Sequence, residues 1–154
     1  MYKRQIQTHQ KTWQKKGSRA IVWNDYRKDN AAAALPEADV LLVDVMGFLS
    51  SIYAVANIAV IGGGFGSGIH NVLEPAAHGV PIWTGPNCSR FLEAQLLRSQ
   101  GGLEVVNSEA SLTFAIEEAI TKPAELRRKG QQAQSFAEAN TGAAHRIAEG
   151  LSHL

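Results

Sequence analysis

Residues 59–81 read AVIGGGFGSGIHNVLEPAAHGVP, and this stretch decides the fold. An apolar run, Ile58–Ile61, comes first and is typical of a buried strand. Glycines at 62, 63, 64, 66 and 68 follow, a density that no strand or helix interior tolerates. Asn71 then suits the N-cap of a helix, and Glu74 stands three residues later, where a capping-box carboxylate belongs. A strand, a glycine loop and a helix N-terminus in this order are typical of an anion site in an α/β protein, because backbone N–H groups and the helix dipole attract negative charge.

The glycine loop matches none of three common motifs. No Gly-x-Gly-x-x-Gly register fits residues 62–68, and no lysine is present for a P-loop. A nucleophile elbow would need glycine where Phe65 stands. Two interpretations therefore remain open: a loop that binds phosphate or sugar by other means, and a flexible connection to an ordinary capped helix.

Strands and helices are expected to alternate along the rest of the chain. The expected strands cover residues 20–23, 40–43, 58–61, 81–83 and 103–106. The expected helices cover residues 3–16, 48–55, 71–78, 89–99, 108–120, 123–139 and 141–151, with a polar loop over 24–36. This alternation predicts an α/β fold, a Rossmann-like parallel sheet with helices on both faces. Ligands of such sheets bind beyond the carboxyl ends of the strands, where residues 44–48, 62–74 and 84–87 are expected.

The order of elements at the start of the chain is unusual. A doubly wound domain normally begins with a strand, whereas this chain begins with a helix. We therefore expect residues 1–154 to form a single domain that lacks its first strand and is a piece of a longer protein. The free sheet edge that results would favour self-association.

Composition limits the partners and the compartment. Eight Lys or Arg and only two acids, Asp25 and Asp29, fall in the first thirty residues, but no interleaved aromatic residues support nucleic-acid binding. The single cysteine, Cys88, excludes an internal disulfide. No apolar run approaches the roughly 20 residues that span a bilayer, so a soluble chain is expected. No cluster of ligating side chains calls for a metal, and no cofactor is expected.

Three segments carry a resemblance to a known family. They read VLLVDVMGFLSSIYAVANIAVIGGGF at residues 40–65, GIHNVLEPAAHGVPIWTGPN at 68–87 and RFLEAQLL at 90–97. In them the chain resembles the C-terminal half of the Kdo transferases, which move 3-deoxy-D-manno-octulosonic acid (Kdo) from CMP-Kdo to a lipid A precursor in lipopolysaccharide biosynthesis. The triple-glycine form looks most like the Bacteroidetes branch of that family.

The resemblance implies a fold and a donor site. The fold is GT-B, in which two Rossmann-like domains face each other, and this chain corresponds to the C-terminal, nucleotide-sugar-binding domain. The implied CMP-Kdo contacts are Met46, Gly47, Phe48, Asn71, Val72, Leu73 and Glu74. Position 48 departs from the pattern, because the family often has Glu there. To these we add Gly62, Gly63, Gly64 and His70, which lie in the glycine loop and at its end and are candidates for the phosphate or the sugar acid. Glu74 suits the ribose hydroxyls, which a carboxylate accepts in charge-assisted hydrogen bonds.

The resemblance also places the reaction outside this chain. The family's catalytic carboxylate belongs to the N-terminal domain, so no catalytic residue is expected here and the chain alone should be inactive. The lipid A precursor would bind through that other domain, at the cytoplasmic face of the inner membrane.

Two other functions fit the same pattern of elements. One is the nucleotide-sugar half of another GT-B enzyme, such as a UDP-sugar transferase or epimerase. The other is a free-standing nucleotide-binding module that is not an enzyme. Preference for CMP over UDP separates the first of these from a Kdo transferase.

Overall fold

The computed structural model describes residues 2–28 and 37–142. The chain divides into two compact units, Met1–Leu49 and Ser50–Leu154. The expectation of one domain over the whole chain stays a prediction. The helix expected over residues 141–151 lies almost wholly outside the described residues.

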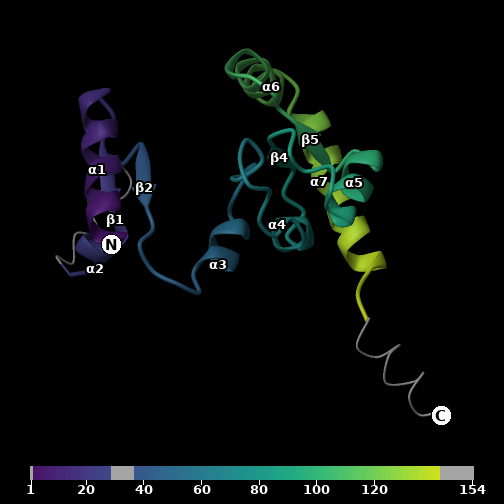
Figure 1. Ribbon diagram of the computed structural model, residues 1–154, viewed down its shortest axis with the longest axis horizontal. Helices are drawn as coiled ribbons and strands as arrows, with labels where there is room; N and C mark the ends of the chain where they lie inside the picture. The colour runs from purple at the N-terminus through teal and green to yellow at the C-terminus, as the bar shows by residue number, and fades with distance from the viewer. Residues whose placement is uncertain (1, 29–36, 143–154) are drawn as a thin grey trace, which may run out of the picture. The chain divides into compact units, whose positions relative to one another are not determined.

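The first unit is a small parallel sheet with a helix packed on it. Its elements are α1 (Tyr2–Lys15), β1 (Ala20–Val22), α2 (Trp23–Lys28) and β2 (Val40–Leu42). Ala20 of β1 lies opposite Val40 of β2, and α1 packs against both strands (Figure 1). The side chain of Gln10 donates to the carbonyl of Ala20 at 3.2 Å, which ties the helix to the strand.

Helix α2 corrects the polar loop that the sequence predicts over residues 24–36. Two contacts distant in sequence hold its first residues. The Asn24 backbone N–H donates to the Asp44 carboxylate at 3.1 Å. The Trp23 ring stacks on Phe48 with 4.7 Å between the ring centroids. Local helix propensity does not reflect contacts with residues some twenty positions away, so the sequence pattern did not predict this helix.

The second unit is built on a three-stranded sheet. Its elements are α3 (Leu49–Tyr53), β3 (Ala59–Ile61), α4 (Leu73–Ala77), β4 (Ile82–Thr84), α5 (Leu92–Ser99), β5 (Leu103–Val105), α6 (Glu109–Thr121) and α7 (Pro123–Ala139). The strand order is β3-β4-β5, and both pairings are parallel. Ile82 of the central strand lies opposite Ala59 on one side and Leu103 on the other.

Both faces of this sheet are covered. Ile82, 1 % exposed, belongs to the larger apolar cluster, which includes Leu97 of α5 and Phe136 of α7. Its neighbour Trp83, 3 % exposed, belongs to a separate cluster with Ala115 of α6. Because successive residues of a strand point to opposite faces, the two clusters lie on opposite sides of the sheet. The predicted α/β class with buried parallel strands is confirmed.

The strands of the described residues form two sheets, β1-β2 and β3-β4-β5, where the sequence analysis expected one. Within the second unit β3 is an edge strand, and its central residue, Val60, is 60 % exposed. An apolar edge strand without a charge or a proline invites pairing. Self-association through such an edge stays a prediction.

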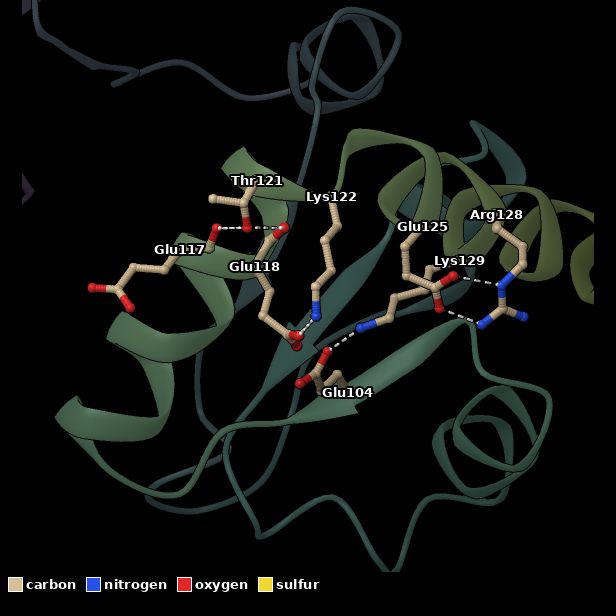
Figure 2. Close-up of polar contacts among 8 residues, drawn as sticks. All are labelled: Glu104, Glu117, Glu118, Thr121, Lys122, Glu125, Arg128 and Lys129. Carbon is tan, nitrogen blue, oxygen red and sulfur yellow. Dashed lines mark hydrogen bonds and ion pairs between the residues drawn. The ribbon is translucent and has the colours of Figure 1, made fainter.

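One ion pair joins helix α7 to the sheet. The Lys129 ammonium lies 2.6 Å from the Glu104 carboxylate of β5, and both side chains are partly buried (Figure 2). The neighbouring pairs Lys122–Glu118 and Arg128–Glu125 connect residues close in sequence and lie on more exposed surface. Among the contacts drawn in Figure 2, the Lys129–Glu104 pair is therefore the one that bridges two elements distant in the chain.

Candidate functional site

The glycine loop after β3 is packed tightly against the loop after β4. Gly64 faces Gly85, and a Cβ on Gly64 would lie only 2.7 Å from the Gly85 Cα. A Cβ on Gly63 would meet the carbonyl of Gly68, and the φ angle of Gly63 is +88°. Gly64 is therefore required because two backbones approach closely, and Gly63 is required both for that reason and for its left-handed conformation.

Hydrogen bonds fix the same loop. Asn87 donates twice, from its backbone N–H to the Gly64 carbonyl at 2.8 Å and from its side chain to the Gly66 carbonyl at 2.9 Å. Within the loop, the Gly66 and Gly68 N–H groups both donate to the Gly63 carbonyl, at 2.9 and 3.1 Å. Of the two interpretations left open by the sequence, the flexible connection is wrong, because the loop is clamped to the end of β4.

The start of helix α4 differs from the prediction. The helix begins at Leu73, and its N-cap is Val72, which has no side chain able to cap. Asn71 instead accepts a hydrogen bond from the Leu73 N–H at 2.9 Å, an Asx-type turn one residue earlier. The predicted capping box is wrong, because this start places Glu74 at the second helical position rather than the third.

A pocket of about 300 Å³ opens beside this turn. It is lined by Ile69, His70, Asn71, Val72, Leu73, Phe91 and Glu93. Four of the predicted site residues, His70 to Leu73, thus share one pocket. It lies where the loop after β3 meets the start of α5, beyond the carboxyl ends of β3 and β4, as expected for a parallel sheet.

Phe91 and Glu93 were not among the predicted site residues. They follow the loop after β4, which the sequence analysis placed at the ligand edge only as far as residue 87. The signal that could have found them is the short distance in sequence from that edge to the start of the next helix. Glu74 lies one residue beyond the pocket lining.

The Glu74 carboxylate affects a neighbouring phenol. Burial raises the pKa of Tyr53, and the negative charge of Glu74 raises it further. Tyr53 is 9 % exposed and Glu74 is half-buried. Next to them, the His78 ring lies 6.4 Å from that of Tyr53, and its Nε2 lies 2.9 Å from the Ser50 hydroxyl. Glu74 is therefore half-buried beside a buried phenol, while Ser50 and His78 nearby are exposed.

Three predicted residues lie in the first unit. Met46 is 99 % exposed, and Gly47 has a φ angle of +78°, which glycine adopts without strain. Phe48, where the family often has Glu, stacks on Trp23. The Phe48 side chain therefore has a packing role within that unit.

The described residues show neither a metal centre nor a membrane span. In the part of the chain that the structure describes, no group of three or more His, Cys, Asp or Glu side chains is arranged to hold a metal ion. No helix among residues 2–28 and 37–142 combines the length and the apolar character needed to cross a bilayer.

The fold is that of a Rossmann-like α/β domain, and a solved structure shares it. The structure is described as the C-terminal CMP-Kdo binding domain of WaaA from Acinetobacter baumannii. The match has a TM-score of 0.72 and 19 % sequence identity and covers 86 % of this chain and 68 % of that one.

Sequence comparison finds curated relatives of the chain. No family model matches the chain. The 3-deoxy-D-manno-octulosonic acid transferase of Bordetella pertussis is 29 % identical over 119 residues, which is 75 % of this chain and 28 % of that protein. The enzyme of the same name from Aquifex aeolicus is 37 % identical over 94 residues, 59 % of this chain and 26 % of that protein. The resemblance to the Kdo transferases is confirmed, and the chain spans about a quarter of the length of these relatives.

Proposed function

We propose that this chain is the donor-binding half of a glycosyltransferase that moves Kdo from CMP-Kdo to a lipid A precursor in lipopolysaccharide biosynthesis. The observation that carries the proposal is the pocket lined by His70 to Leu73, at the end of the clamped glycine loop. The residues of this pocket and loop belong to the segments in which the chain resembles the transferases.

The pocket suits a nucleotide sugar in size and chemistry. Its volume of about 300 Å³ is within the range of small-molecule sites. Leu73 and Phe91 offer apolar surface to a base or a sugar ring, and His70 and Asn71 offer polar atoms at the rim. Glu74, half-buried one residue further on, is proposed to accept hydrogen bonds from ribose hydroxyls.

Catalysis by this half would be indirect. Glycosyl transfer requires stabilisation of the departing nucleotide, and donors held in a fixed loop stabilise it without reorganisation. We propose that the loop and pocket hold the CMP group while a second domain supplies the catalytic carboxylate and the lipid acceptor. The full protein would then work at the cytoplasmic face of the inner membrane, where its lipid substrate lies.

A comparison of binding affinities for three nucleotides tests the proposal. Isothermal titration of the purified chain with CMP, CMP-Kdo and UDP should give binding of the first two and at least tenfold weaker binding of UDP. Tighter binding of UDP would support another GT-B enzyme instead. Binding of none of the three would contradict a donor site in this chain.

A further inference from the structure

Arg90 lines a second, smaller pocket at the ligand edge of the second unit. A pocket of about 190 Å³ is lined by Gly66, Asn87, Ser89 and Arg90. Phe91, the next residue, lines the pocket of about 300 Å³ that contains His70 to Leu73. The Arg90 guanidinium sits 5.2 Å from the centre of the Phe91 ring, so Arg90 lines the smaller pocket and lies beside a residue that lines the larger one.

The glycine at the end of the loop, Gly68, leaves space for the Arg90 side chain. Gly68 has a φ angle of +127°, and a Cβ there would run into the Arg90 guanidinium and lie 2.9 Å from the Phe91 ring. Gly68 is buried, whereas Arg90 is exposed. The loop therefore leaves room for the guanidinium, and Asn87, three residues earlier, holds that loop in place through its two hydrogen bonds.

Arg90 has no ion-pair partner among the residues that the structure describes. The ion pairs found among the described residues are Arg19–Glu37, Lys122–Glu118, Arg128–Glu125 and Lys129–Glu104. In that part of the chain, no carboxylate oxygen lies within 4.0 Å of the Arg90 guanidinium. A guanidinium presents five N–H donors in a planar fork that matches a carboxylate or a phosphate.

The start of helix α5 adds to the positive potential at Arg90. Arg90 comes two residues before Leu92, the first residue of α5, and the N-terminus of a helix carries partial positive charge. One carboxylate, Glu93, lies in the first turn of this helix. The helix dipole and the guanidinium would both attract an anion in the pocket that Arg90 lines.

We propose that Arg90 forms an anion subsite beside the donor pocket and binds the phosphate or the sugar carboxylate of the nucleotide sugar. The inference rests on the proposed function, because the anion it names belongs to that donor. Arg90 opens the segment at 90–97 in which the chain resembles the family, but it is not among the donor contacts that the resemblance implies.

Substitution with a matched control tests the role of Arg90. Arg90→Gln should weaken binding of CMP-Kdo to the purified chain by about tenfold or more in isothermal titration, and Arg90→Lys should restore part of it. Arg98→Gln removes the same charge from the other end of α5 and should bind as the unaltered chain does. Equal losses for CMP and CMP-Kdo assign the guanidinium to the phosphate, and a loss for CMP-Kdo alone assigns it to the sugar carboxylate. Unchanged binding of CMP-Kdo by Arg90→Gln overturns the inference and leaves the proposed function intact.

A second measurement needs no nucleotide. Titration of the labelled chain with inorganic phosphate should shift the Arg90 Nε–H resonance in NMR spectra and leave that of Arg98 in place. This shift supports the anion subsite even if CMP does not bind, in which case only the proposed function fails. Absence of a shift at Arg90, or equal shifts at both arginines, overturns the inference.

Discussion

Glu74 lies beside the donor pocket and in the first turn of α4, where it takes no part in a capping box. Because helix α4 has no capping box, Glu74→Gln should leave the melting temperature near that of the unaltered chain. Loss of the anionic acceptor should weaken CMP-Kdo binding about tenfold, the factor that corresponds to ~1.4 kcal/mol. Calorimetric titration and a thermal melt measure the two quantities.

The same variant has a readout in the free protein. The negative charge of Glu74 raises the pKa of Tyr53, so Glu74→Gln should lower that pKa in a spectroscopic titration of the phenol. Glu117→Gln, on the exposed surface of α6, is the control and should alter neither the pKa nor the binding. A parallel fall in melting temperature and affinity would mean that Glu74 acts through stability alone.

Thr84 is the buried polar side chain of the described core, at 0 % exposure. Its hydroxyl donates to the carbonyl of Ile61 at 3.2 Å, across the ends of β4 and β3. Thr84→Val keeps the shape and removes the donor, which should lower the free energy of unfolding by about 1 kcal/mol. Denaturant titration measures the loss, with Thr113→Val on the exposed face of α6 as the control. An unchanged midpoint would mean that the hydrogen bond adds no net stability.

At the scale of elements, packing around the glycine loop decides which of its glycines are needed for stability. An added Cβ at Gly64 meets the backbone of Gly85, whereas at Gly66 the nearest atom is 3.8 Å away. Gly64→Ala should therefore destabilise the chain by about 1–3 kcal/mol, the usual range for overpacking. Gly66→Ala should be close to neutral. Equal stability of the two variants in denaturant titration would contradict the clamped loop.

Helix α7 gives a second comparison between elements. Lys129→Met breaks the partly buried pair with Glu104, and Lys122→Met breaks an exposed pair within four residues of chain (Figure 2). The first variant leaves a partly buried carboxylate without its partner and should be clearly less stable. The second should differ little from the unaltered chain, because exposed pairs contribute little. Thermal melts of both variants at one pH measure the difference.

The sequence predicted the elements whose signals are local. The apolar runs of β3, β4 and β5 were found, and so was α7, whose Pro123 occupies the first turn as predicted. Helix α2 was missed because its first residues depend on Asp44 and Phe48, which are distant in sequence. The start of α4 was misjudged because the Asx turn at Asn71 competes with the N-cap that the same residue could form.

The residues of the candidate site were predicted only in part. His70 to Leu73 could be found because glycines, a capping residue and a family motif mark them in one segment. Phe91, Glu93 and Arg90 were not predicted, although they lie close in sequence to the ligand edge, because only the packing of two loops shows that they line pockets there. Sequence order places residues at an edge, and tertiary contacts decide which of them share a pocket there.

At the scale of the whole molecule, the chain corresponds to about a quarter of its curated relatives. We expect no transferase activity from it alone, because the proposed catalytic carboxylate and acceptor site belong to another domain. Incubation with CMP-Kdo and a lipid A precursor, followed by mass spectrometry, should give no product. The Aquifex aeolicus transferase in the same assay is the positive control, and turnover by the chain itself would contradict the proposal.

The position of Cys88 allows local opening of the second unit to be measured by thiol labelling. The thiol is the chain's single cysteine, it is 3 % exposed, and it follows Asn87, whose hydrogen bonds clamp the glycine loop. A thiol reagent can reach it only when this segment opens, so the labelling rate measures the free energy of local opening. A ligand that binds the closed form slows labelling in proportion to its saturation of the pocket. Occupancy of the donor pocket can therefore be followed through the rate at which a chromogenic thiol reagent reacts with Cys88, without any change to the sequence.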